Sequence, residues 1–173
     1  MKKLFVSTVV AGLLVSGAAF AQDAGAVYGN LGYTHTTVDV TGGKDATFKG
    51  LTGRLGYQFS ENFGVEGEAT FSIDDDKVNI SGTQVAVKLK NQFAAYLTGT
   101  LPVSEQFGLH ARLGYAYSKL EGKAGNVKAD ADAKGFAYGV GASYMFDDKN
   151  GLRGDYTRVE DSNNWTVAYV RKF

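Results

Sequence analysis

The sequence predicts an all-β protein, an eight-stranded antiparallel up-and-down β-barrel that crosses a membrane. Beyond residue 21, apolar and polar residues alternate along most of the chain, and two is the period of a strand with two different faces. The alternating segments have about ten residues, which is the length of a tilted strand that spans a bilayer. The connections alternate between short and long, which is typical of a barrel with short turns on one side of a membrane and longer loops on the other.

Composition excludes several other classes of protein. The chain has 173 residues, with 18 Lys and Arg against 18 Asp and Glu, and therefore no formal net charge, whereas a nucleic-acid partner requires a basic surface. It has no Cys, which excludes disulfides, thiolate metal sites and a Cys nucleophile. Its 23 Gly residues accompany 13% aromatic residues, so the glycines do not indicate a disordered chain.

The first 21 residues have the features of a cleaved secretory signal peptide. Two Lys residues precede a mostly apolar segment, and Ala19 and Ala21 form an Ala-x-Ala cleavage site before Gln22. The apolar run is short for a transmembrane helix, and an N-terminal membrane anchor is the alternative. We therefore expect a leader over residues 1–21 and one barrel domain over residues 22–173.

The first four predicted strands each place large apolar residues on one phase and polar or small residues on the other. These strands are 27–36, 50–59, 63–73 and 89–101. In order, their apolar phases are Val27, Leu31 and Tyr33; Leu51, Leu55, Tyr57 and Phe59; Phe63, Val65, Ala69, Phe71 and Ile73; and Phe93, Ala95, Leu97 and Leu101.

The last four predicted strands follow the same rule. They are 107–118, 136–146, 152–157 and 165–173. In order, their apolar phases contain Leu109, Ala111, Leu113, Tyr115 and Tyr117; Phe136, Tyr138, Val140, Ala142, Tyr144 and Phe146; Leu152 and Tyr156; and Trp165, Val167, Tyr169 and Phe173.

The connections fall into two sets. The short set is 60–62, 102–106 and 147–150, and the long polar set is 38–47, 74–87 and 121–134, with 161–164 as a short fourth member. In a membrane barrel the short set lies in the periplasm and the long set outside the cell.

Backbone hydrogen bonding decides which phase faces outward. In hydrocarbon every N–H and C=O must be paired within the protein, so strands that cross a membrane must close into a barrel. The apolar phase then faces lipid, and the polar phase fills a lumen that has room only for side chains. Alternation alone leaves open a soluble secreted barrel or sandwich with its apolar phase inward.

Aromatic residues concentrate at the ends of the predicted strands, as expected for girdles at two membrane interfaces. The girdle residues near the short turns are Tyr57, Phe59, Phe63, Phe107, Tyr144 and Phe146, and those near the loops are Tyr115, Tyr117 and Tyr138.

Charged residues of both signs fall on the lumen phase. Because an unpaired charge in a narrow lumen is costly, we expect ion pairs that fill the barrel as a static plug. A gate in which ion-pair partners exchange is the alternative. The candidate network is Arg54, Glu66, Glu68, Lys90, His110, Arg112, Arg153 and Asp155.

The segments 29–33, 53–59, 65–69, 111–115 and 165–173 resemble the small eight-stranded outer-membrane barrel family that includes OmpX, the N-terminal domain of OmpA and the opacity-type proteins. In that family, a terminal Phe after alternating apolar residues is read by the barrel-assembly machinery. Here Arg171 departs from the pattern, at a rim where a long side chain can snorkel. The residues that match this assembly signal are Trp165, Val167, Tyr169 and Phe173.

The resemblance implies a monomeric bacterial outer-membrane protein. Its implied partners are outer-membrane lipid, lipopolysaccharide, and the periplasmic chaperones and assembly machinery that act during biogenesis. We expect a structural role in the envelope with a plugged lumen. The alternatives are surface adhesion through the extracellular loops, with a host ligand that the sequence does not name, and a narrow gated pore for water or small ions.

We expect no enzymatic activity, no cofactor and no resident metal. The related lipid A deacylase has a lipid-facing His-x-Ser, but here Thr36-Thr37 follow His35, and Ala111-Arg112 follow His110. A possible cation site in the second long loop is Asp74, Asp75 and Asp76, because hard cations prefer oxygen ligands.

Overall fold

A computed structural model describes residues 25–39, 46–73, 76–80, 83–124, 127–160 and 162–173. Within these ranges the chain forms nine strands, and no helix there is both long and apolar enough to cross a membrane. The strands are β1 Val27–Val38, β2 Ala46–Gln58, β3 Phe63–Ser72, β4 Asp76–Ile80, β5 Thr83–Pro102, β6 Phe107–Ala124, β7 Val127–Met145, β8 Asn150–Val159 and β9 Ser162–Lys172.

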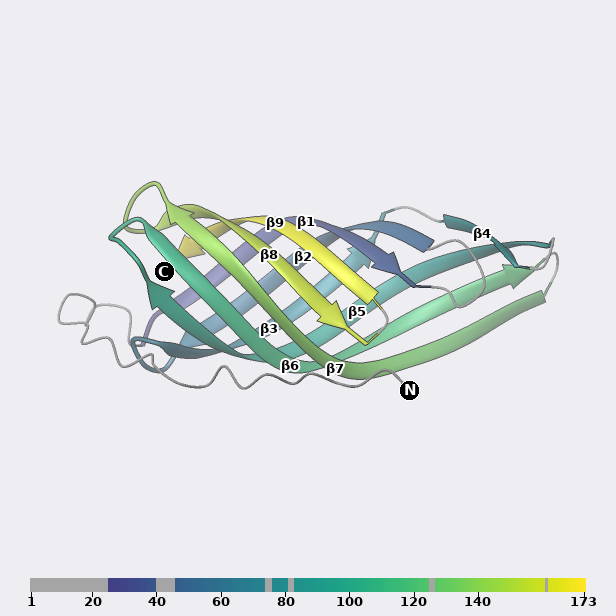
Figure 1. Ribbon diagram of the computed structural model, residues 1–173, viewed down its shortest axis with the longest axis horizontal. Helices are drawn as coiled ribbons and strands as arrows, with labels where there is room; N and C mark the ends of the chain where they lie inside the picture. The colour runs from purple at the N-terminus through teal and green to yellow at the C-terminus, as the bar shows by residue number, and fades with distance from the viewer. Residues whose placement is uncertain (1–24, 40–45, 74–75, 81–82, 125–126, 161) are drawn as a thin grey trace, which may run out of the picture.

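Eight of the strands close into an antiparallel barrel. The sheet order is β3-β2-β1-β9-β8-β7-β6-β5-β4, and an additional pairing of β3 with β5 completes the circle and leaves β4 outside it. The two terminal strands of the barrel, β1 and β9, pair along their length from Tyr28↔Lys172 to Val38↔Ser162. Figure 1 shows the tilted strands of the barrel, with β5, β6 and β7 extending beyond it on the side of β4. The predicted eight-stranded barrel is thus confirmed.

Two of the predicted long loops contain more strand than we expected. Strands β6 and β7 pair from Phe107↔Tyr144 to Ala124↔Val127, so most of the predicted loop 121–134 is a hairpin that prolongs the barrel wall. Strand β4, in the predicted loop 74–87, pairs with β5. Polar composition resembles that of a loop, but a hairpin outside the bilayer can pair its backbone whatever its hydropathy.

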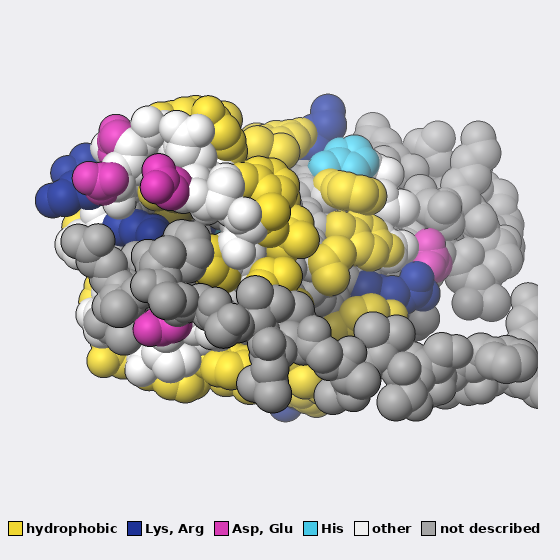
Figure 2. Space-filling view, turned by 60° about the vertical axis from the view of Figure 1, so that its left-hand side comes forward, with side chains coloured by type: hydrophobic (Ala, Val, Ile, Leu, Met, Phe, Trp, Pro, Cys, Tyr) yellow, Lys and Arg dark blue, Asp and Glu magenta, His cyan; other side chains and the backbone are white. Residues whose placement is uncertain are grey.

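The burial pattern places the polar phase inside. Leu31, Leu55 and Val167 are 67%, 64% and 64% exposed, whereas the buried residues include Thr52 at 1% and Thr157 at 0%. Figure 2 shows hydrophobic side chains across the middle of this face, with charged side chains toward both of its ends. This arrangement suits a lipid environment, and it contradicts the alternative of a soluble barrel with its apolar phase inward.

In each of the three short turns, a Ser or Asp side chain accepts a hydrogen bond from the backbone N–H three residues later. The backbone N–H of Phe63 donates to Ser60 Oγ, and that of Phe107 donates to Ser104 Oγ, both at 3.0 Å. In the third turn Asp147 Oδ1 accepts from the backbone N–H of Asn150 at 2.8 Å. Hydrogen bonds from the Asn150 side chain and from the backbone of Lys149 and Asn150 hold the pKa of the Asp147 carboxyl below its ordinary value. Each turn therefore satisfies its own exposed backbone.

The pairing of β5 with β6 shifts register once, at Lys90. The register with β6 runs regularly up to Asn91↔Lys119, shifts at Lys90, and continues from Leu89↔Leu120. Between these two pairs β5 has one more residue than β6, which is the pattern of a bulge. Beyond the shift, Lys88 lies opposite Glu121 and Leu89 opposite Leu120. The prediction that Lys90 joins the lumen network assumed uninterrupted alternation, and its side chain lies outside the described residues.

Close contact between strands requires Gly114. A Cβ added there would collide with the carbonyl oxygen of Ala95 on the neighbouring strand β5, whereas a Cβ at the outward Gly53 would meet nothing within 4 Å. We predict that Gly114→Ala lowers the free energy of unfolding by about 2 kcal/mol or more, because the backbone must shift. The matched change Gly53→Ala should alter it by less than about 0.5 kcal/mol. Urea unfolding of both variants in vesicles measures the difference, and equal stability would contradict this account.

Candidate functional site

The candidate site is a cluster of charged side chains across the middle of the lumen. Its members come from β2, β3, β6 and β8 and lie on the buried phase of each strand. Arg54 and Glu68 are directly opposite in the β2–β3 ladder, and Arg153 and Asp155 lie two residues apart on β8. The remaining contacts join strands that are not neighbours. The six residues of this ion-pair ring are Arg54, Glu66, Glu68, Arg112, Arg153 and Asp155.

Arg54 joins two carboxylates across the lumen. Its Nε donates to Glu68 Oε2 at 2.6 Å, and its Nη1 donates to Asp155 Oδ2 at 2.6 Å. Asp155 also accepts from Arg153 Nε through Oδ1 at 2.9 Å. Half of the ring is therefore an alternating chain of acids and bases.

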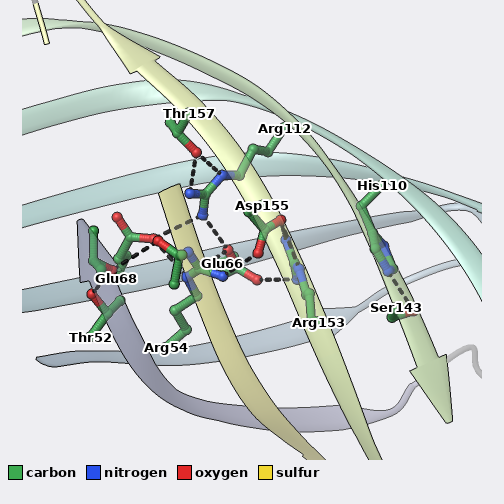
Figure 3. Close-up of polar contacts among 12 residues, drawn as sticks. Thr52, Arg54, Glu66, Glu68, His110, Arg112, Ser143, Arg153, Asp155 and Thr157 are labelled. Carbon is green, nitrogen blue, oxygen red and sulfur yellow. Dashed lines mark hydrogen bonds and ion pairs between the residues drawn. The ribbon is translucent and has the colours of Figure 1, made fainter. Parts of the chain in front are cut away.

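The remaining contacts close the ring by linking Arg153 back to Glu68 through Glu66 and Arg112. Arg153 Nη1 donates to Glu66 Oε2 at 2.8 Å, and Arg112 Nη1 donates to Glu66 Oε1 at 3.2 Å. The same Arg112 nitrogen donates to Glu68 Oε2 at 2.8 Å. Each arginine thus bridges two carboxylates, and each carboxylate accepts from two arginines, as the dashed lines in Figure 3 show.

The ring is buried and electrically balanced. All six residues are at most 7% exposed, and three guanidinium groups face three carboxylates. Tyr28 donates from its hydroxyl to Glu66 Oε2 at 3.0 Å, and the Arg112 guanidinium carbon lies 4.5 Å from the centroid of the Tyr96 ring. This pairing of charges matters because breaking a buried ion pair leaves the partner charge without compensation.

Tyr28 and Tyr96 were not among the predicted network residues. Both fall on the inward phase, which is the signal that identifies them as lumen residues. Their particular contacts depend on strand tilt, which the sequence does not specify.

A layer of hydroxyl groups lies beside the ring, on the side away from the three short turns. Thr34 Oγ1 bonds Thr166 Oγ1 at 2.8 Å, and Thr52 Oγ1 bonds Thr70 Oγ1 at 2.8 Å. Thr34 also bonds Thr52, which joins the two pairs into one chain across β9, β1, β2 and β3. These side chains satisfy one another inside the wall of the barrel.

His110 lies apart from the ring, although it was predicted as part of the network. Its Nε2 is 2.8 Å from Ser143 Oγ, and its Nδ1 is 3.2 Å from Thr100 Oγ1. Figure 3 shows this pair separated from the charged cluster. Among the described residues, the ring contains six of the eight predicted network residues and lacks His110; the Lys90 side chain is not described.

Within the part of the chain that the structure describes, a cavity lies toward each mouth of the barrel. The cavity on the side of the short turns has a volume of about 100 Å³ and includes His110, Ser143 and Arg153 in its lining. The cavity at the opposite end has a volume of about 240 Å³ and includes Gln92 and Ser118 in its lining. The ion-pair ring and the threonine layer lie between the two.

The predicted girdle residues lie on the outer surface. Tyr117 is half-buried, with Lys134 Nζ 5.6 Å from its ring centroid, and the remaining eight are exposed. The proposed assembly residues are also exposed, with Trp165 at 61% and Phe173 at 71%.

Two predicted sites lie outside the described residues. The cleavage residues Ala19, Ala21 and Gln22 are one, and the side chains of Asp74, Asp75 and Asp76 are the other. In the part of the chain that the structure describes, no group of three His, Asp or Glu residues is placed to hold a metal ion.

The chain has the same fold as several solved β-barrel structures. The crystal structure of Ail, the attachment invasion locus protein of Yersinia pestis, has a TM-score of 0.66 and 17% identity, and the match covers 87% of this chain and 99% of that one. The crystal structure of the outer membrane protein OprG from Pseudomonas aeruginosa has a TM-score of 0.66 and 15% identity, and the match covers 87% of this chain and 97% of that one. The N-terminal β-barrel domain of Pseudomonas aeruginosa OprF has a TM-score of 0.64 and 11% identity, and the match covers 88% of this chain and 100% of that one.

At these identities the likeness establishes the fold, and sequence comparison establishes the family. Curated protein sequences give no match. Residues 7–173, however, match the family described as the outer membrane protein beta-barrel domain, which agrees with the closed barrel and the apolar outer surface. The chain belongs to this family and is a protein of the bacterial outer membrane.

Proposed function

We propose that the protein is a non-conducting barrel with a structural role in the outer membrane. The observation that carries this proposal is the closed ring of three arginines and three carboxylates across the lumen. An eight-stranded barrel has an interior that side chains can fill. Opening a path would require several charge-assisted hydrogen bonds to break together, because each ring member holds two partners.

The route to the membrane is part of the same proposal. We expect cleavage before Gln22 by the signal peptidase, and recognition of the segment that ends at Phe173 by the assembly machinery. The proposed partners are outer-membrane lipid and lipopolysaccharide, with the periplasmic chaperones acting during biogenesis. The barrel acts as a monomer without cofactor, resident metal or catalytic site.

The plugged lumen predicts very little ion flow. The refolded protein in a planar bilayer should show no sustained conductance. Under the alternative of a gated pore, the wild type shows recurrent openings, and Glu68→Ala or Arg112→Ala changes their frequency because partner exchange is altered. Single-channel recording distinguishes the two, and sustained or recurrent wild-type currents would contradict the plug.

The ring should also stabilise the barrel. Glu66→Ala leaves Arg112 and Arg153 each without one partner in a buried site, and we expect a loss of about 3–5 kcal/mol in the free energy of unfolding. The matched control is Arg158→Ala, whose pair with Asp39 is 4.0 Å long and about half exposed, and there we expect less than about 1 kcal/mol. Urea unfolding followed by tryptophan fluorescence measures both, and similar losses would contradict a stabilising ring.

Surface attachment is the second candidate function. The observation that favours it is the length of β5, β6 and β7. These strands continue beyond the level at which β8 ends, and β6 and β7 remain paired there. The structural neighbour Ail is described as an attachment protein and has been crystallised with a heparin analogue. A projecting sheet of this kind offers a surface to sulfated or other extracellular ligands.

One variant separates the envelope role from attachment. Because Ser118 and Ala133 are directly opposite in the β6–β7 ladder, residues 119–132 can be replaced by an Asn-Gly turn. If the role is structural, this variant should restore the detergent resistance of a deletion strain as fully as the wild type does. If the protein is an adhesin, the variant should lose most binding to cells or to immobilised heparin. Failure of even the wild type to affect detergent resistance would contradict the structural role.

A further inference from the structure

We propose that the cavity at the short-turn mouth of the barrel is a binding site for a small organic carboxylate, with Arg153, Lys172 and a hydroxyl group beside His110 as its hydrogen-bond donors. The cavity has a volume of about 100 Å³, and all three of these side chains line it. One water molecule needs only about 10–15 Å³ of such space, so the cavity has room for a molecule of several non-hydrogen atoms. This binding is a second property of the barrel, independent of its structural role.

A row of polar side chains on four neighbouring strands lines the cavity. Thr100 and His110 are directly opposite in the β5–β6 ladder. Ser143 and Arg153 are directly opposite in the β7–β8 ladder. His110 Nε2 lies 2.8 Å from Ser143 Oγ and joins the two pairs, and Figure 3 shows Arg153 on the side of the ring nearest to them. Gly108, opposite Ser143 on β6, has no side chain to fill the space beside the row.

The histidine leaves at least one hydroxyl proton of this row available. His110 Nδ1 is 3.2 Å from Thr100 Oγ1, and its Nε2 contacts Ser143 Oγ. A neutral imidazole has one N–H donor and one acceptor nitrogen, so it donates to one hydroxyl and accepts from the other. The hydroxyl that receives the N–H keeps its own proton for a further acceptor, and this holds for either tautomer. The row therefore offers an O–H donor beside His110.

Arg153 offers a second donor at the same cavity. Its Nε and Nη1 donate to Asp155 and Glu66 within the ring. Its Nη2 lies 2.9 Å from Asp155 Oδ1 as part of the same ion pair, but it makes no hydrogen bond to the described part of the chain. Arg153 is 4% exposed and lines the cavity, so an acceptor atom bound there can satisfy this nitrogen.

The charge of the lining favours an anion. The six ring members compensate one another, and Lys172 adds a positive charge to the cavity from the inward phase of β9. Glu105 also lines the cavity, but it is exposed between β5 and β6, where water and salt screen its charge. An acceptor group with a negative charge is therefore the complement of Arg153, Lys172 and the hydroxyl row.

The apolar part of the lining favours an organic anion over an inorganic one. Phe107, Met145 and Val170 line the same cavity, and Val170 is 6% exposed. Sites for small molecules typically combine apolar walls with a few well-placed polar groups. A carboxylate with a short carbon chain can use both, because its oxygens accept from the donors while its chain covers the apolar side chains.

Titration with butyrate tests the site in the refolded protein in detergent micelles. Sodium butyrate replaces sodium chloride at constant ionic strength, and the backbone amide shifts of Thr100, His110 and Ser143 in the NMR spectrum give the half-saturating concentration. We expect a saturable shift of these signals, while those of Gln92 and Thr166, toward the other mouth, stay unchanged. Absence of a saturable shift overturns the site.

Two variants should weaken binding by different means. Thr100→Val/Ser143→Ala removes both hydroxyls, and Gly108→Val fills the cavity but keeps the polar row, so each should raise the half-saturating concentration about tenfold or more. Lys172→Gln should raise it about threefold or more. The matched control Lys149→Gln removes an exposed charge at the same mouth but outside the lining, and it should change the value less than about twofold. Unchanged affinity of the first two variants overturns the site, and equal effects of the two lysine changes overturn the role of Lys172.

Two further probes test the class of ligand. Butyramide should bind at least about tenfold more weakly than butyrate because it lacks the charge, and formate at least about tenfold more weakly because it lacks the carbon chain. Equal binding of butyramide overturns the assignment to an anion. Equal binding of formate overturns the assignment to a carboxylate with a carbon chain. Heat-modifiable gel migration confirms that every variant has folded.

Discussion

The backbone of this protein has no water to bond with inside the membrane, and the rest of the structure follows from that constraint. Every N–H and C=O must find a partner in the chain, so the sheet closes through β3–β5 on one side of the circle and β1–β9 on the other. Closure fixes which phase of each strand faces lipid. It also creates a lumen that must be filled, and the same chain supplies the filling.

The two-residue period of the strands gives the lumen and the outer surface side chains of opposite polarity. Outside, exposed residues such as Leu31 and Val167 match a hydrocarbon solvent. Inside, Arg54 and its partners are buried at positions where a single unpaired charge would be costly. Small residues such as Gly114 let neighbouring strands approach closely. The high glycine content is thus partly a packing property of a narrow barrel.

Much of the fold could be predicted from alternation, because a period of two is a local property of the chain. The pairing of Arg54 with Glu68 was also within reach, since adjacent strands place them at similar depth. The bulge at Lys90 was not, because it interrupts the period on which the prediction rests. The Arg54–Asp155 contact and the separation of His110 from the ring depend on strand tilt, which joins residues from distant strands. The hairpin of β6 and β7 was missed because polar strands outside a bilayer resemble loops in composition.

The ion-pair ring has a consequence for the line where the two ends of the barrel meet. In the sheet order, β2 and β8 flank the β1–β9 pair, and Arg54 of β2 bonds Asp155 of β8 across the interior. This ion pair spans the junction of the first and last strands on the inside of the barrel. Separation of β1 from β9 would pull Arg54 and Asp155 apart and expose both charges. The ion pair therefore stabilises the β1–β9 junction, which forms only when the whole chain is in place, against opening.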